Sequence, residues 1–447
     1  MNQLYGKVRI HYSWLFLLFT CLSGCTNSDE LVEVKEHSGK AEIPNIDLFK
    51  PLQRERPAYD ICKELPSIMV PENHDDPLKK VQYRYQIYQT DDDTIDTDAG
   101  TIAFMLPGGP GEGAIVDDPG KIPTYGDLKW VLIDPRGVGC NHEAFKETDS
   151  SHLTTLNHAR DVLEVLSALN PKKYLIYGGS YGTVVGTVVA HLATNDERIP
   201  DPISVILEGI LGRGDIPIFR EVLSFWQEIR TNDPQNELWL TEVEREQLEI
   251  SDQGWMRALF YLSYFDKVYI QTSFKYFVSE LRKHLKSNTI SEETANALNA
   301  IRVMSEDTLI SPIGARRLMG AIGCREIFNM TGGLFTVEGD NIGLTGKNPC
   351  GTVTFKPYDS EDYQIVGVPV YYLQGRDDNA TTVDNAEHHY EKQVKASAKH
   401  YHVVPDAGHS VLGIKLKTCK DEIFKKAAMQ ESLTSVLDED NLCKILE

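Results

Sequence analysis

The sequence lacks the short motifs that most often bind metals, phosphates or dinucleotides. It contains no CxxC or HExxH spacing, and neither the GxxxxGK nor the GxGxxG pattern. Basic residues are also scarce, with 45 Lys and Arg against 66 Asp and Glu, for a formal net charge of −21. Such a surface repels nucleic-acid backbones, so we expect no nucleic-acid partner. No metal or organic cofactor is implied.

A hydrophobic run long enough to cross a bilayer is missing as well. The apolar segment WLFLLFTCLSGC is short and follows Lys7, Arg9 and His11, an arrangement typical of a secretion signal. Its end resembles the lipobox of bacterial lipoproteins, which implies acylation of Cys25. An uncleaved anchor or an ordinary signal peptide is the alternative. We expect a signal peptide over 1–24, an acidic tether over 25–55, and an exported protein anchored to a membrane of the cell envelope.

Eight cysteines are present, of which Cys21 and Cys25 lie in this N-terminal segment. The others are even in number, which in an exported chain favours disulfides over metal binding. Many pairings are possible, and Cys140 follows a glycine-rich loop where a reactive thiol is conceivable. No neighbour that would lower its pKa is evident, so a structural role is expected. We favour bonds between chain neighbours: Cys62 with Cys140, Cys324 with Cys350, and Cys419 with Cys443.

Short, almost wholly apolar runs predict the strands of a sheet that is covered on both faces. They are TIAFML, WVLID, KYLIYG, ISVILEG and VPVYYLQG, and each ends at glycine, proline or aspartate. A helical pattern over 150–173 separates two of them. In VQYRYQIYQ, apolar and polar residues alternate, which predicts a half-buried strand. Strands that alternate with helices indicate an α/β fold with a doubly wound, mostly parallel sheet, whose ligands bind at the carboxyl ends of the strands.

The pattern changes between residues 212 and 341, where tryptophans, acidic residues and helix-like segments replace the short strands. We interpret this segment as an inserted helical cap. The core would then comprise residues 56–211 and 342–447.

The segment LIYGGSYGTVVG contains a GxSxG motif centred on Ser180. The motif follows a predicted strand and opens a predicted helix, the context of a nucleophile elbow. Gly178 and Gly182 would allow the close backbone approach that this turn demands. A plain glycine turn is the alternative.

A serine nucleophile needs a histidine base and a carboxylate that orients it, in the chain order Ser, Asp, His. Asp377 and Asp378 follow one predicted strand, and His409 follows the next. An oxyanion hole needs two backbone donors. The loop PGGPGEGA supplies glycines for the first, and the amide of Tyr181 would be the second. A phosphate-binding loop is the competing interpretation of these glycines.

Together these stretches resemble one group of α/β-hydrolases, the proline iminopeptidase and tripeptidyl aminopeptidase family. The matching segments are CKELPSIMVPENHDDP, LPGGPGEGA, DPRGVGCN, GGSYGT, GRDDNATT and DAGHS, in the family's order. The resemblance implies an α/β-hydrolase fold with a helical cap, Ser180 as nucleophile, His409 as base, Asp378 as orienting acid and Gly109 in the oxyanion hole. It implies a bracing role for Asp134 and Arg136, and GAIGCREI supports the pairing of Cys324 with Cys350.

The predicted activity is that of a serine hydrolase, most simply a peptidase that releases residues or short peptides from free N-termini through an acyl-enzyme on Ser180. LPGGPG lacks the histidine that opens this motif in proline iminopeptidases, so the tripeptidyl branch is the nearer likeness. A carboxylesterase with the same triad is the alternative, and a non-catalytic surface lipoprotein is the second. An amine pocket requires a carboxylate, for which the candidates are Glu208, Asp215, Glu221, Glu237, Glu242 and Glu244.

Overall fold

The computed structural model describes residues 55–56, 60–88, 100–116, 128–215, 218–304, 311–328, 335–339, 341–344, 350, 353–438 and 441–443. The predicted signal peptide, the lipidation site Cys25 and nearly all of the predicted tether lie outside these residues. Within the described part of the chain, no helix has the length and apolar character needed to span a membrane.

A seven-stranded sheet forms the centre of the molecule, in the order β13-β12-β8-β7-β5-β6-β4. Neighbouring strands run parallel, except that β4 is antiparallel to β6. The inner strands are buried along their length, as the apolar runs predicted. The strands are β4 (Gln86–Tyr88), β5 (Ile102–Leu106), β6 (Lys129–Leu132), β7 (Tyr174–Gly179), β8 (Ser204–Glu208), β12 (Val370–Gly375) and β13 (Lys399–Val404).

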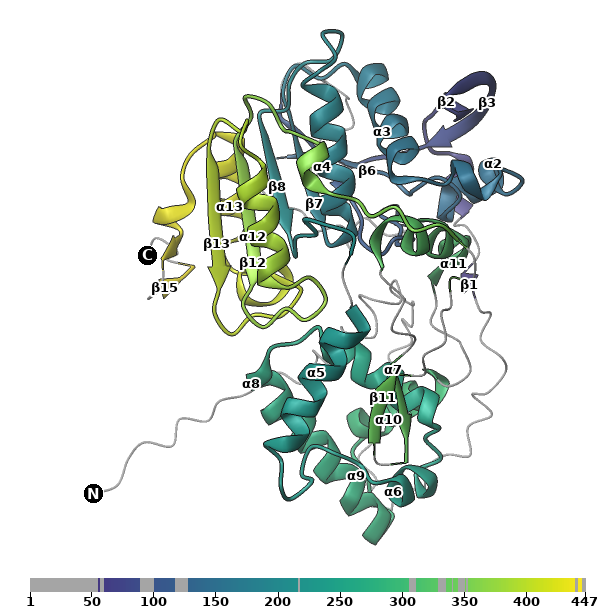
Figure 1. Ribbon diagram of the computed structural model, residues 1–447, viewed down its shortest axis with the longest axis vertical. Coiled ribbons are helices and arrows are strands. Elements are labelled where there is room, and N and C mark those ends of the chain that lie inside the picture. The colour runs from purple at the N-terminus through teal and green to yellow at the C-terminus, as the bar shows by residue number, and fades with distance from the viewer. Residues whose placement is uncertain are drawn as a thin grey trace, which may run out of the picture.

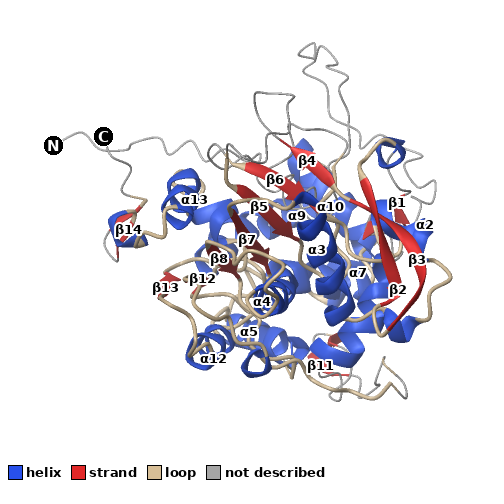
Figure 2. Cartoon of the chain, turned by 90° about the horizontal axis from the view of Figure 1, so that it is seen from above, coloured by secondary structure: helices blue, strands red, loops and turns tan. Residues whose placement is uncertain are grey.

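Helices cover both faces of this sheet, which makes the fold doubly wound (Figure 2). On one face, α3 (Thr155–Leu169), α4 (Tyr181–Ala193) and α12 (Val383–Lys392) share a core with the side chains of Ile176 and Val205. On the other face, α13 (Lys420–Ala428) packs against the strand side chains that point the opposite way. The carboxyl ends of the parallel strands therefore meet at one edge between two helical layers.

The predicted strand over 81–89 is divided between two sheets. Its first half belongs to β3 (Asp76–Arg84), which forms a separate hairpin with β2 (Ser67–Asn73), and its second half is β4. The alternation holds as far as Tyr83 and Tyr85, which are buried, but Gln86 is buried too. Gln86 exchanges two hydrogen bonds with the backbone of Val116, so a polar side chain is used inside the core at this corner.

A helical cap lies beside the core at the sheet's carboxyl edge (Figure 1). It has its own hydrophobic core, centred on Trp226, Trp239 and Trp255, all of which are almost fully buried. The hairpin of β10 (Phe335–Glu338) and β11 (Asn341–Leu344) joins this cluster through Val337. The helices are α5 (Ile218–Thr231), α6 (Glu242–Gln247), α7 (Asp252–Leu262), α8 (Lys267–Tyr269), α9 (Lys275–Ser287) and α10 (Glu292–Met304).

Between α10 and the β10–β11 hairpin, the chain returns to the main core. Strand β9 (Ser311–Pro312) pairs with β1 (Glu55–Arg56), and α11 (Ala315–Leu318) continues into a helical segment over Met319–Ile327. Leu318, Ile322 and Ile327 are buried in the core cluster of α3 and α4. The segment that we interpreted as one cap over 212–341 thus contains a stretch that packs as part of the core.

Among the described residues, three disulfides join neighbours in the chain, Cys62 with Cys140, Cys324 with Cys350 and Cys419 with Cys443. These are the pairs favoured from the sequence. The second anchors the returning segment. The third ties α13 to the strand pair β14 (Leu437–Asp438) and β15 (Asn441–Leu442).

Candidate active site

Ser180 occupies the turn between β7 and α4. Its φ of 55° and ψ of −125° form a backbone conformation that residues other than glycine rarely adopt. The turn is held because the Ser180 amide donates to the carbonyl of Glu208 at 2.8 Å, while Thr183 donates to the Ser180 carbonyl. The half-buried serine side chain is presented at the carboxyl edge of the sheet. This is the geometry of a nucleophile elbow.

The two glycines of the motif are required by close backbone contacts. A Cβ on Gly178 would lie 2.2 Å from the carbonyl oxygen of Gly182, and a Cβ on Gly182 would lie 2.0 Å from that of Leu106. Leu106 ends β5, so the nucleophile helix packs directly on the start of the glycine-rich loop. Because Gly178 and Gly182 have no side chains, the turn that carries Ser180 can lie directly against the glycine-rich loop.

His409 and Asp378 form a hydrogen-bonded pair. Nδ1 of His409 lies 2.8 Å from Oδ2 of Asp378. The carboxylate also accepts hydrogen bonds from the Thr381 hydroxyl at 2.7 Å and from the amides of Ala380 and Thr381, both at 2.9 Å. These bonds fix the carboxylate in place. With Nδ1 carrying the proton, Nε2 is left with a lone pair that can accept the proton of a serine hydroxyl.

The titration of this pair follows from burial and charge. Burial alone would raise the pKa of Asp378, but His409 and the donors around the carboxylate outweigh it and hold the pKa below its usual value. Burial would lower the pKa of His409, yet the charges of Asp378, Glu208 and Glu112 outweigh it and raise that pKa. The buried aspartate is thus held in its ionised form, and its charge favours a protonated imidazole on His409.

The neighbouring Asp377 faces away from this pair. Its Oδ2 accepts a hydrogen bond from the amide of Lys267 in the cap at 3.2 Å. Two other histidines of this part of the chain, His388 and His389, have different partners. His388 pairs with Asp359, and the buried His389 contacts Thr187 and the hydroxyl of Tyr372.

Ser180 and His409 lie on either side of the end of β8. Ser180 is bonded to Glu208, and the next residue, Gly209, lies against the imidazole. A Cβ on Gly209 would be 2.9 Å from Cε1 and 3.0 Å from Nδ1 of His409. The structure therefore brings Ser180, Asp378 and His409 to one edge of the sheet.

The glycine-rich loop after β5 borders the serine. A Cβ on Gly108 would lie 3.2 Å from Cβ of Ser180, and Gly109, the predicted oxyanion donor, is the next residue. Tyr181 opens α4, and the first amides of a helix have no partner within it. The Tyr181 side chain is buried, and its hydroxyl lies 3.0 Å from that of Thr155, which anchors α4 to α3.

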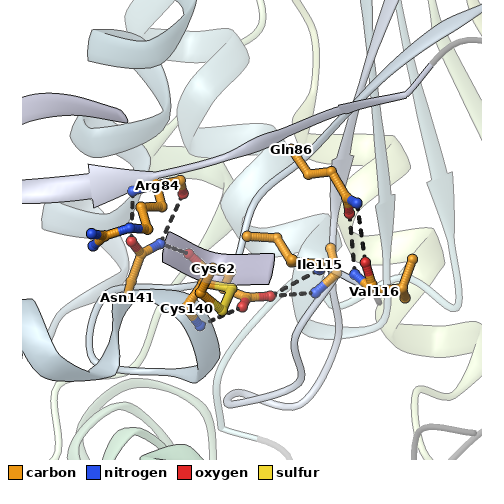
Figure 3. Close-up of a disulfide and its surroundings, with 9 residues drawn as sticks. Cys62, Arg84, Gln86, Ile115, Val116, Cys140 and Asn141 are labelled. Atoms are coloured by element: carbon orange, nitrogen blue, oxygen red, sulfur yellow. Dashed lines mark hydrogen bonds between the residues drawn. A yellow bond between two sulfur atoms is a disulfide. The ribbon is translucent and has the colours of Figure 1, made fainter. Parts of the chain in front are cut away.

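Asp134 braces the far end of this loop. Its Oδ1 accepts the amides of Ala114 and Ile115 at 2.8 and 2.9 Å, and its Oδ2 accepts that of Cys140 at 2.9 Å. Figure 3 shows the disulfide of Cys62 and Cys140 in this region, with the hydrogen bonds that Asn141 exchanges with the backbone of Arg84 and that Gln86 exchanges with the backbone of Val116.

Arg136, the other residue of the segment DPRGVGCN for which a bracing role was expected, is fully buried and pairs with Asp161 through two hydrogen bonds. Asp134 and Arg136 thus both act as structural braces.

Most of the carboxylates proposed from the sequence for an amine pocket are engaged elsewhere. Glu208 is buried and accepts hydrogen bonds from the hydroxyl of Tyr177 at 2.5 Å and from the amide of Leu412 at 2.7 Å. Glu221 is half-buried on α5, and burial and Asp384 raise its pKa. The ion pairs of the others are Asp215 with Arg213, Glu237 with Lys275 and Glu244 with Arg282; Glu242 lies in the first turn of α6.

Glu112, which no sequence motif singled out, lies in the glycine-rich loop itself. A Cβ on Gly108 would lie 2.8 Å from its Oε2, which places this carboxylate beside Ser180. The available signal was a single charged residue within a run of glycines next to the predicted oxyanion hole.

Comparison with known proteins agrees with this architecture. The family described as the alpha/beta hydrolase fold matches residues 105–415. A proline iminopeptidase of Neisseria gonorrhoeae is 32% identical over 127 residues, and a probable proline iminopeptidase of Leptolyngbya boryana is 30% identical over 137 residues. These alignments cover 28% and 29% of this chain, and 37% and 36% of the relatives. The chain thus spans just over a third of the length of these relatives.

Among solved structures, a proline iminopeptidase of Mycobacterium smegmatis superimposes with a TM-score of 0.41 at 14% identity, covering 82% of this chain and 99% of that one. The family match extends from β5 to beyond His409 and includes well over half of the residues. The chain therefore belongs to the α/β-hydrolase fold family.

Proposed function

We propose that this chain is an exported serine peptidase that removes residues from the free N-termini of short peptides. One observation carries the proposal. An ionised, fully hydrogen-bonded Asp378 holds Nδ1 of His409 at the same sheet edge as Ser180 on its strained turn. A serine, a histidine and a carboxylate in these roles are the machinery of acyl transfer.

In the proposed reaction, Oγ of Ser180 attacks the carbonyl carbon of the scissile bond and its proton moves to Nε2 of His409. The negative charge that develops on the carbonyl oxygen is stabilised by the amides of Gly109 and Tyr181. The C–N bond then breaks, and the leaving amine takes the proton from His409. Water, activated by the same histidine, hydrolyses the acyl-enzyme and regenerates Ser180.

A peptide is favoured over an ester as substrate for two reasons. The relatives of highest identity named above are proline iminopeptidases. A helical cap with its own core also lies over the sheet edge that carries the triad, which suits the recognition of a chain end.

Export and lipid anchoring are part of the same proposal. Three disulfides in the described residues suit an oxidising compartment. The test is metabolic labelling with a fatty-acid analogue in a bacterial host. The full chain is expected to take up label and sediment with membranes, and Cys25→Ala is expected to do neither. Label that persists in Cys25→Ala would contradict the anchor.

The activity is tested on the chain from residue 43 onward with three kinds of substrate: free-amine aminoacyl arylamides, their N-acetylated forms, and short acyl esters. Cleavage of the free-amine amides, abolished in Ser180→Ala, is the expected result. Cleavage of esters alone would identify an esterase instead, and Ser180→Ala with full activity would remove Ser180 from the mechanism. A chain inactive on all three would match a non-catalytic lipoprotein.

A further inference from the structure

Glu112 combines three properties that its neighbours lack. Its Oε2 and Cβ of Ser180 both lie next to Gly108. A methyl group on Gly108 would be 2.8 Å from Oε2 of Glu112 and 3.2 Å from Cβ of Ser180. Its charge acts on His409, whose pKa it helps to raise. It also acts on the phenols of Tyr261 and Tyr264 in the cap. Glu112 is thus placed between the triad and the cap.

The carboxylate of Glu112 has no cationic partner among the described residues. Burial raises its pKa, an effect that the positive His409 and the amide of Gly108 oppose. By its accessible surface, however, Glu112 is an exposed residue, so the effect of burial on this pKa comes from the many protein atoms nearby and not from exclusion of solvent. An exposed carboxylate beside Ser180 with no ion-pair partner among the described residues is available to a ligand.

The loop that carries Glu112 is held at several points. The Glu112 amide donates to the carbonyl of Gly108, Gly111 is pressed against the backbone of Ala315, and the amides of Ala114 and Ile115 are bound to Asp134. The backbone that carries the carboxylate is therefore fixed before a substrate arrives, which limits the entropic cost of binding to the ordering of the Glu112 side chain.

We propose that Glu112 binds the ammonium group of the substrate's N-terminal residue, and that this same residue carries the carbonyl attacked by Ser180. The protein then releases single N-terminal residues rather than tripeptides. This inference rests on the proposed peptidase function and names the group that selects the substrate within it.

The distance between the substrate's amine and the attacked carbonyl carbon explains why only one residue would be released. The nitrogen of a residue lies about 2.5 Å from its own carbonyl carbon, and each further residue adds up to about 3.5 Å. The amine of a tripeptidyl group would lie roughly 7 Å farther from the attacked carbon. A carboxylate beside the nucleophile therefore reaches the amine of the residue that carries the attacked carbonyl, but not the amine of a tripeptidyl group.

Aromatic side chains of the cap lie beside His409, and such side chains suit a bound cation. Tyr264 packs its ring edge-on against His409, with centroids 5.0 Å apart, and contacts the rings of Phe260 and Tyr261. Faces of such rings attract an ammonium group and cover the apolar part of a small residue.

The test compares Glu112→Gln with the parent protein on alanyl, prolyl and leucyl arylamides, their N-acetylated forms and alanyl-alanyl-prolyl arylamide. We expect kcat/KM for the free-amine aminoacyl substrates to fall on the order of 100-fold, because a charged hydrogen bond is lost. The preference for the free amine over the acetylated form should collapse. The parent protein should release single residues from the tripeptidyl substrate, as seen by mass spectrometry.

Glu221→Gln is the matched control, since Glu221 is the cap carboxylate whose pKa is also raised by burial and which was a candidate from the sequence. It is expected to keep the free-amine preference. Labelling of Ser180 by a fluorophosphonate shows that each variant is folded. In Glu112→Gln the acid limb of the pH profile should also move to lower pH, because removing a negative charge lowers the pKa of His409.

The outcomes separate this inference from the proposed function. A parent protein that cleaves only esters would overturn both. A parent protein that cleaves free-amine amides, with the preference unchanged in Glu112→Gln or lost in Glu221→Gln, would overturn the role of Glu112 and leave the peptidase. Direct release of the intact tripeptide would overturn the limit of one residue.

Discussion

At the scale of single residues, the two adjacent aspartates after β12 have separate tasks. Asp378 holds the imidazole of His409, whereas Asp377 holds the amide of Lys267 in the cap. Asp378→Asn should lower kcat roughly 10⁴-fold, because the histidine is then held in the wrong tautomer. Asp377→Asn should keep most activity. Steady-state kinetics of both variants decide this, and the reverse order of effects would exchange the two roles.

The protonation of His409 sets the acid side of the pH profile. Its pKa is raised above 6.5 because Asp378, Glu208 and Glu112 favour the charged imidazole more than burial disfavours it. Only the neutral imidazole accepts the serine proton, so kcat/KM should fall as pH drops through a value above 6.5. A pH series on a fast substrate measures it. A midpoint well below 6.5 would show that burial dominates.

The position of the Glu112 side chain could not be predicted from the sequence. The order Ser180, Asp378, His409 follows from a motif and from strand ends, and both are visible in the chain. The direction of the Glu112 side chain depends on how the loop folds over Gly108 and under the cap. Tyr261 and Tyr264, on whose pKa values the charge of Glu112 acts, are far away in sequence, so no local pattern predicts this environment.

At the scale of elements, α4 sits against the end of β5 with no space for a side chain. Gly182→Ala would place a methyl carbon 2.0 Å from the carbonyl oxygen of Leu106. Because neither backbone can yield without moving Ser180 or the glycine-rich loop, the free energy of unfolding should fall by more than about 3 kcal/mol. Urea unfolding followed by fluorescence measures the loss.

Gly320 provides the control for that substitution, since a Cβ there meets nothing within 4 Å. Gly320→Ala should change stability by less than about 0.5 kcal/mol. Equal losses in the two variants would mean that the contact with Leu106 is not the cause.

The strands of the sheet were predictable because burial on both faces imposes continuous apolar runs. The return of residues 311–328 to the core was not, since an amphipathic helix has the same pattern whichever cluster it joins. Likewise, the alternation through Tyr83 and Tyr85 predicted a strand but not its division at Arg84 between two sheets. Partner choice is a tertiary property that a period of two does not encode.

At the scale of the whole molecule, the three disulfides close loops of different length. Cys62 and Cys140 are 78 residues apart, whereas Cys419 and Cys443 are 24 apart. In the chain-entropy description, the longer loop constrains the unfolded chain more, by about 1 kcal/mol. Replacing Cys62 and Cys140 by Ala should therefore lower the free energy of unfolding more than replacing Cys419 and Cys443. Urea titrations of the two double variants make the comparison, and the opposite order would point to native-state packing as the dominant factor.

His409, the proposed base, is held by the cap as well as by the core. The amide of His409 donates to the carbonyl of Tyr264 at 2.8 Å, and Gly408 lies so close to the backbone of Tyr264 and Phe265 that a side chain would not fit. The cap is consequently not an interchangeable module. A chimaera that carries the cap of another hydrolase should lose turnover even on substrates too small to touch it, because the exchange removes the support of the imidazole.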